Sequence, residues 1–128
     1  MKLNKTEIKP LKKILIVEDE KLIGWSVTKL LQKSGYHVFI TESPEKAIEL
    51  LNSLEFHLVL TDLNLPLSNG QRFAEIIKQK DPAIPVILMS SSNLTKEEKI
   101  EYKGKVDEII EKPIDFDELI SLINQLIK

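Results

Sequence analysis

The 128-residue sequence contains no cysteine and only two histidines. The absence of cysteine excludes disulfide scaffolds, thiol nucleophiles, zinc ribbons and redox CxxC motifs. His37 and His57 are far apart in the sequence, which argues against a histidine-rich metal site. No apolar run approaches the roughly 18 residues that a membrane-spanning helix needs, and the N-terminus lacks the apolar segment of a secretory signal. We therefore expect a cytoplasmic protein that contacts no membrane.

The chain has the size of one domain, and its charge is unevenly distributed. Residues 1–13 carry five lysines and one glutamate, a net charge of +4, whereas residues 14–128 carry 13 basic and 19 acidic side chains, a net charge of −6. We interpret residues 1–12 as a polar, lysine-rich leader and residues 13–128 as the folded domain. Because binding along a nucleic-acid backbone needs a basic face, the acidic body predicts no direct contact with nucleic acid.

Strand and helix patterns alternate along the whole chain. Apolar, β-branched runs predict buried strands, and amphipathic stretches with capping residues at their starts predict helices. The predicted strands cover residues 13–17, 36–40, 56–60, 85–89 and 106–110. The predicted helices cover residues 20–33, a stretch opened by Ser43-Pro44, residues 71–80, a stretch opened by the capping box Thr95–Glu98 and a last stretch opened by Asp115. This alternation predicts an α/β fold with a parallel sheet covered by helices on both faces.

Polar and charged residues stand where the predicted strands end. Glu18 and Asp19 follow the first strand, Asp62 the third, Ser90 the fourth and Lys112 the fifth. In an open parallel sheet the carboxyl ends of the strands form one edge, where ligands bind. Carboxylates that meet there need a proton or a cation between them, and oxygen ligands favour Mg²⁺ or Mn²⁺. Taken singly, each residue also has an ordinary structural role, such as helix capping by Asp19.

These segments, in this order, resemble the receiver domain of two-component response regulators, in particular the chemotaxis-type receivers. The resemblance extends from about Lys13 to Lys128 and implies a flavodoxin-like (βα)5 three-layer sandwich with the strand order 2-1-3-4-5. It rests on ILIVEDE at Ile14–Glu20, LVLTDLNLP at Leu58–Pro66 with Asn69-Gly70, PVILMS at Pro85–Ser90 and EKP at Glu111–Pro113.

The resemblance implies a role for each polar residue at this edge of the sheet. Asp62 would accept a phosphoryl group from a phosphohistidine, Ser90 would hydrogen-bond that group, and Lys112 would pair with one of its oxygens. The Lys112–Pro113 bond matches the usual cis peptide of the family.

The resemblance also implies Mg²⁺ as the cofactor, with Mn²⁺ as a substitute. Asp19 and Asp62 would bind the cation directly, and Asn64 would bind it through its backbone carbonyl. Glu18 would act mainly through water.

The implied role is that of a signalling module, which catalyses only its own phosphorylation and dephosphorylation and switches conformation. Its partners would be a sensor histidine kinase or a histidine phosphotransfer protein, and a downstream protein target that the sequence does not identify. It would be a monomer or a weak phosphorylation-dependent dimer. Two alternatives stay open: a receiver fragment of a larger transcription regulator, and a flavodoxin-like electron carrier. The acidic Glu18–Glu20 segment disfavours the carrier, and the end of the chain at the last predicted helix favours a stand-alone receiver.

Two further residues bear on the partners and on the switch. Trp25 lies about 160° from Ile23 around the predicted helix, so we expect it to be partly exposed and to belong to a docking surface. Ile109 occupies the position where receivers usually have an aromatic switch residue. We therefore expect phosphorylation to reposition residues 91–102 instead.

Overall fold

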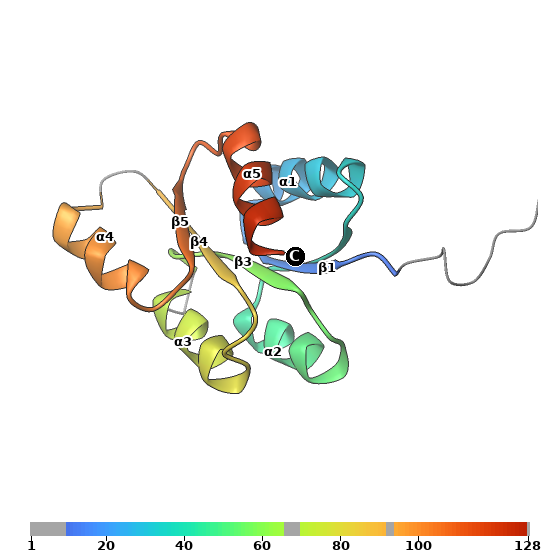
Figure 1. The fold of residues 1–128 in the computed structure, drawn as a ribbon, viewed down its shortest axis with the longest axis horizontal. Helices are drawn as coiled ribbons and strands as arrows, with labels where there is room; N and C mark the ends of the chain where they lie inside the picture. The colour runs from blue at the N-terminus through green and yellow to red at the C-terminus, as the bar shows by residue number, and fades with distance from the viewer. Residues whose placement is uncertain (1–9, 66–69, 92–93, 128) are drawn as a thin grey trace, which may run out of the picture.

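The computed structural model describes residues 10–65, 70–91 and 94–127. Five parallel strands form one sheet in the order β2-β1-β3-β4-β5, which confirms the predicted flavodoxin-like topology. The strands are β1 (Lys13–Val17), β2 (His37–Thr41), β3 (Leu58–Asp62), β4 (Val86–Ser90) and β5 (Glu108–Glu111). The helices are α1 (Lys21–Lys33), α2 (Pro44–Ser53), α3 (Gly70–Lys80), α4 (Lys96–Lys103) and α5 (Phe116–Leu126). Helices α1 and α5 cover one face of the sheet, and α2 and α3 cover the other (Figure 1).

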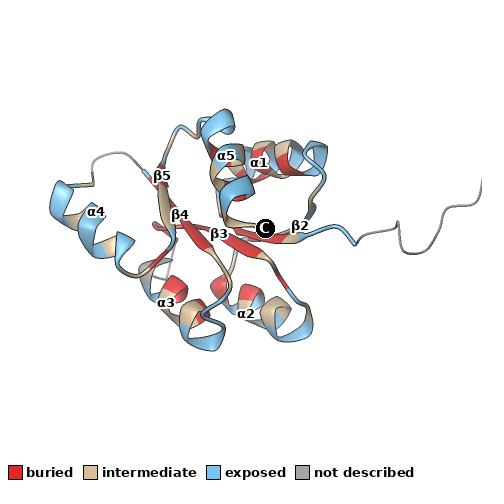
Figure 2. Ribbon diagram, in the orientation of Figure 1, coloured by how far each residue is buried: buried red, intermediate tan, exposed pale blue. Residues whose placement is uncertain are grey.

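The central strands supply the core. All residues of β3 and β4 are buried, as are four of the five residues of β1 (Figure 2). Successive side chains of a strand point to opposite faces, so each strand feeds two apolar clusters. Leu15 and Val17 pack with α2 and α3, whereas Ile14 and Ile16 pack with α1 and α5. Burying one side chain of this size contributes about 1.5 to 3 kcal/mol, so the sheet is held from both faces.

The helix ends follow the predicted capping residues. Ser43, Thr95 and Asp115 each accept a hydrogen bond from the backbone N–H three residues later, at 3.1 to 3.3 Å. Helix α1 ends before Gly35, whose φ of 95° lies in the left-handed region that glycine tolerates best. Within the described ranges, no helix has both the length and the apolar character that crossing a membrane demands. The predicted leader lies mostly outside the described residues and stays a prediction.

The amino end of β3 shows how pairing decides where a strand begins. The predicted strand starts at residue 56, but pairing with β1 starts at Leu58, which lies beside Ile14. His57 stands just before this point: its N–H donates to the Lys13 carbonyl at 2.8 Å, and its Nδ1 accepts from the Lys13 N–H at 3.0 Å. The imidazole is therefore hydrogen-bonded to the backbone, at the edge of the sheet opposite to Asp62.

Candidate functional site

Three buried polar side chains end three neighbouring strands at the carboxyl edge of the sheet. Glu18 directly follows β1, Asp62 is the last residue of β3, and Ser90 is the last residue of β4. Their exposed fractions are 1%, 2% and 1%. Because β1, β3 and β4 are adjacent in the sheet, the topology brings these ends together. Charged groups buried this deeply need a partner of opposite charge.

Lys112 is that partner. Its Nζ lies 2.8 Å from Glu18 Oε1, 3.0 Å from Asp62 Oδ2 and 3.3 Å from Glu20 Oε1. Nζ donates hydrogen bonds to Asp62 and Glu20, whereas its short contact with Glu18 is an ion pair without hydrogen-bond alignment. The backbone N–H of Lys112 donates to the Ser90 carbonyl at 2.8 Å. The sheet itself therefore fixes the lysine beside the carboxylates, and the following Lys112–Pro113 bond is cis, as predicted.

Burial is the main influence on the ionisation of Glu18 in this cluster. Burial raises the pKa of Glu18 to about 7; the close contact with the Lys112 ammonium group opposes the rise, and the Asp62 carboxylate adds to it. Burial by itself would lower the pKa of Lys112, but Glu18 and Asp62 hold it above its usual value of 10.5. The site thus favours an added positive charge, either a proton on Glu18 or a cation.

The loops after β3 and β4 position the remaining groups. Asp62 Oδ1 accepts a hydrogen bond from the Asn64 N–H at 2.9 Å, and the Asn64 side chain donates to Ser91 Oγ at 2.9 Å. Ser90 Oγ is buried and has no hydrogen-bond partner among the described residues. A buried hydroxyl without a hydrogen bond lowers the stability of the folded state by about 1 to 3 kcal/mol. A ligand group that accepts a hydrogen bond from Ser90 would therefore be stabilised here.

The structure places most of the predicted site residues together. Those at the edge are Glu18, Asp62, Ser90 and Lys112, with Asn64 in the loop beyond. Carboxylate oxygens of Glu18, Glu20 and Asp62 lie within 4.8 Å of one another, and the half-buried Asp19 is not in this group. Sequence reasoning missed Glu20. Its spacing of two residues from Glu18 could have indicated it, because alternate residues of an extended segment share one face.

The acidic cluster of Glu18, Glu20 and Asp62 fits a divalent cation. Its donors are hard carboxylate oxygens, the ligands that Mg²⁺ prefers. One ammonium group opposes three carboxylates, so the cluster keeps a negative charge when all of them are ionised. The Asp62 carboxylate adds to the rise in the pKa of Glu18 that burial causes.

Comparison with known families agrees with this geometry. The family model of the response regulator receiver domain matches residues 14–124. The chain belongs to this family. Similar curated proteins include the probable transcriptional regulator ycf29 of Pyropia yezoensis, 31% identical over 117 residues that cover 90% of this chain and 53% of the relative. The sensory transduction protein BceR of Halalkalibacterium halodurans is 29% identical, with 91% of this chain and 50% of that protein covered. The chain spans about half the length of these curated relatives.

Solved receiver domains have the same fold. The receiver domain of the Francisella response regulator 1452 superposes with a TM-score of 0.82 at 27% identity, covering 90% of this chain and 95% of that one. The response regulator TrrA of Thermotoga maritima, solved with Mg²⁺ and BeF, gives a TM-score of 0.80 at 28% identity, covering 91% of this chain and 99% of that one. The family match confirms the prediction that this chain is a receiver domain. Receiver domains of response regulators are signalling modules that histidine kinases phosphorylate.

The raised pKa of Glu18 predicts that the metal-free protein loses stability as pH rises. The folded chain holds this proton up to about pH 7, whereas the unfolded chain releases it near the usual glutamate pKa of 4.5. The folded state therefore binds more protons between these values, and the free energy of unfolding should fall by on the order of 1 to 3 kcal/mol from pH 5 to pH 7. Urea unfolding should show a smaller fall for Glu18→Gln, and an equal fall in both proteins would contradict the assignment.

Proposed function

We propose that this chain is the phosphoacceptor receiver of a two-component system, with Asp62 as the acceptor. The observation that carries the proposal is the Asp62 carboxylate, which is 2% exposed and lies 3.0 Å from Lys112 Nζ at the end of β3. Ser90, whose hydroxyl has no hydrogen-bond partner in the described part of the chain, ends the adjacent strand. The phosphoryl donor would be a phosphohistidine on a sensor histidine kinase or on a histidine phosphotransfer protein.

The transfer needs positioning and charge neutralisation more than acid–base chemistry. A carboxylate oxygen of Asp62 attacks phosphorus, the bond from phosphorus to the histidine nitrogen breaks, and that nitrogen keeps the electron pair and takes up a proton. The product is an acyl phosphate on Asp62. Lys112 would neutralise a phosphoryl oxygen, and the Ser90 hydroxyl would donate a hydrogen bond to another. Hydrolysis of this acyl phosphate by water would reset the module, so the chain would catalyse only its own phosphorylation and dephosphorylation.

The proposed cofactor is Mg²⁺, with Mn²⁺ as a substitute. We propose Asp19 and Asp62 as direct ligands, together with the backbone carbonyl of Asn64, while Glu18 acts mainly through water. When bound, the cation would supply positive charge against the oxygens of the phosphoryl group. The position of Glu20 within the acidic cluster makes it the alternative to Asp19.

The wider biological role is also a proposal. The similarity to ycf29, a probable transcriptional regulator about twice as long as the matched segment, supports the alternative that this receiver serves a larger transcription regulator. A stand-alone receiver, a cytoplasmic location, and a monomer or weak phosphorylation-dependent dimer stay predictions.

Phosphorylation of Asp62 can be tested with a small phosphoryl donor. Incubation with Mg²⁺ and acetyl phosphate should add about 80 Da to the intact mass of the wild-type chain, the mass of one phosphoryl group. Asp62→Asn should show no addition because it lacks the nucleophile. Asp81→Asn is the matched control, since Asp81 lies at the opposite edge of the sheet and bonds the Ala83 N–H. An adduct on Asp62→Asn equal to that of the wild type would refute the assignment.

Lys112 should compete with Mg²⁺ for the Asp62 carboxylate and for the negative charge of Glu18 and Glu20 beside it. Its ammonium group lies within 3.3 Å of all three, so Lys112→Met should bind Mg²⁺ about tenfold more tightly while accepting phosphate more slowly. Tryptophan fluorescence during a Mg²⁺ titration measures the affinity, because the single tryptophan, Trp25, shares a hollow with Glu18. Weaker Mg²⁺ binding by Lys112→Met would refute this competition.

The same titration separates Asp19 from Glu20 as the metal ligand. Asp19→Asn should weaken Mg²⁺ binding about tenfold or more, because a cation depends on its charged direct ligands. Glu20→Gln should change the affinity by less than about threefold, since Glu20 is 58% exposed and its charge is screened. A larger loss of Mg²⁺ affinity in Glu20→Gln than in Asp19→Asn would assign the ligand role to Glu20 instead.

The output switch should act through α4. This helix has no buried residue, and Ile109 on β5 is β-branched and lacks the polar tip of an aromatic switch residue such as tyrosine. Elements with little burial open most easily, so a ligand can shift them. Amide hydrogen exchange with and without a beryllofluoride mimic of the phosphoryl group should therefore change across residues 91–103, of which 92 and 93 lie outside the described residues. Equal protection there, with change confined to α1, would contradict this prediction.

A further inference from the structure

A second concave surface lies beside the acidic cluster. It is a hollow of about 600 Å³ between α1 and the turn that joins β2 to α2. Trp25 and Ile40 line it, and they are 61% and 45% exposed. Helix α1 approaches β2 closely at Gly24, where a Cβ would come within 2.5 Å of Ile40 Cδ1. The backbone thus keeps two large apolar side chains at the walls of an open hollow, an arrangement typical of binding surfaces.

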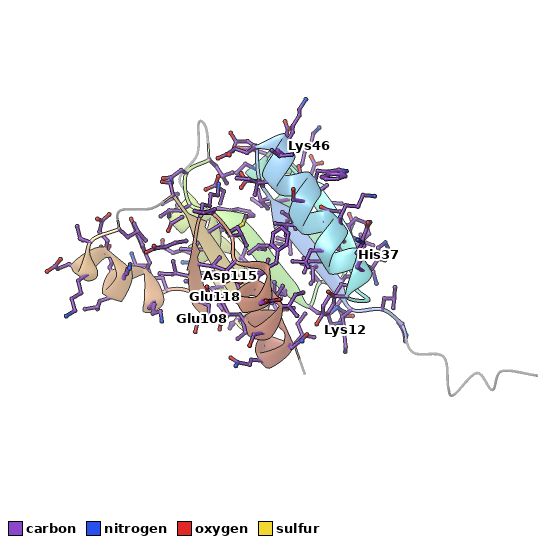
Figure 3. The ribbon with its side chains drawn as sticks, turned by 90° about the horizontal axis from the view of Figure 1, so that it is seen from above. Lys12, His37, Lys46, Glu108, Asp115 and Glu118 are labelled. Carbon is purple, nitrogen blue, oxygen red and sulfur yellow. The ribbon has the colours of Figure 1, made fainter. Side chains whose placement is uncertain are left out.

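Two lysines give the rim of this hollow a positive charge. Lys21 is the first residue of α1 and Lys46 lies in the first turn of α2, and neither has an ion pair among the residues described. In Figure 3, Lys46 lies at the end of the molecule where α1 begins, away from Lys12 and His37. The amino ends of both helices add partial positive charge. Two acids also line the hollow: the exposed Glu42, and the buried Glu18, which is paired with Lys112. Among the described residues, two lysines without ion pairs therefore face one carboxylate without an ion pair.

Thr28 adds a polar group to the same hollow. Its Oγ1 is buried and has no hydrogen-bond partner among the described residues. A threonine in a helix has two accessible side-chain rotamers, so the hydroxyl can turn toward a ligand without breaking a bond. The hollow therefore combines an indole ring, an aliphatic wall, a positive rim and one available donor.

We propose that this hollow binds a small planar aromatic anion. The ring would pack between Trp25 and Ile40, and the anionic group would lie between Lys21 and Lys46. A planar ring suits an exposed indole face, and the volume is that of an ordinary small-molecule site. The two lysines of the rim favour an anion over a neutral molecule. Glu18 lines both this hollow and the acidic cluster, but the proposed occupant does not depend on phosphorylation of Asp62.

Naphthoate is the probe for this site, and the readout is the indole N–H resonance of Trp25, the only tryptophan in the chain. Titration of the full chain should shift this resonance saturably, with a dissociation constant on the order of 1 mM or lower for a ligand of this size. The neutral naphthamide should bind at least about fivefold more weakly, because it lacks the charge. No saturable shift up to about 10 mM, or equal affinity for both probes, would overturn the proposal.

Matched charge reversals separate the rim from general electrostatics. Lys46→Glu should weaken naphthoate binding about tenfold. Lys29→Glu, an exposed position on α1 that does not line the hollow, should leave the affinity within about twofold. Equal losses in the two variants would overturn the assigned site. A dilution series without probe adds a last test: an indole resonance that moves with protein concentration would show that a second copy covers the hollow, which also overturns the proposal.

Discussion

The carboxyl edge of this sheet depends on one ammonium group shared by three carboxylates. Lys112 Nζ lies 2.8 to 3.3 Å from oxygens of Glu18, Asp62 and Glu20. The lysine backbone is itself bonded to the carbonyl of Ser90, so the position of the charge follows from strand pairing. Removing one member of a buried ion pair costs about 3 to 5 kcal/mol, because the other charge is left without a partner. The Lys112 ammonium group allows the Asp62 carboxylate to be buried. A phosphoryl group would add negative charge at this place, and a cation would add positive charge.

Buried polar groups that lack partners lower the free energy of unfolding, and the apolar packing of the sheet offsets this loss. Burial keeps the pKa of Glu18 near 7, and the hydroxyl of Ser90 has no partner among the described residues. Both features are unfavourable unless a ligand is present. The strands that carry them are also the most buried, with apolar clusters on both faces. The apolar core thus stabilises an edge of the sheet at which a carboxylate and a hydroxyl would gain interactions from a ligand.

Much of this fold could be predicted from the sequence, and the errors have a common cause. Apolar runs gave the correct order of the elements, but they do not mark where strand pairing begins. The predicted fifth strand starts at residue 106, yet Val106 closes the end of α4 through a bond from its N–H to the Tyr102 carbonyl. It is buried all the same, so its hydrophobicity resembles that of a strand residue. Pairing with β4 begins only afterwards, at Glu108.

The acids after β1 show where sequence reasoning about the site stops. Strand periodicity places Glu18 and Glu20 on one side and Asp19 on the other, and the carboxylates of the first two do join Asp62. Periodicity alone would have placed Glu20 in the cluster, whereas the family resemblance assigns the metal to Asp19. The two agree if the cluster changes when a cation binds: Glu20 contacts Lys112 while 58% exposed, so little holds it there. A cation that draws in Asp19 would displace only this weak contact and leave the buried Glu18 and Asp62 in place.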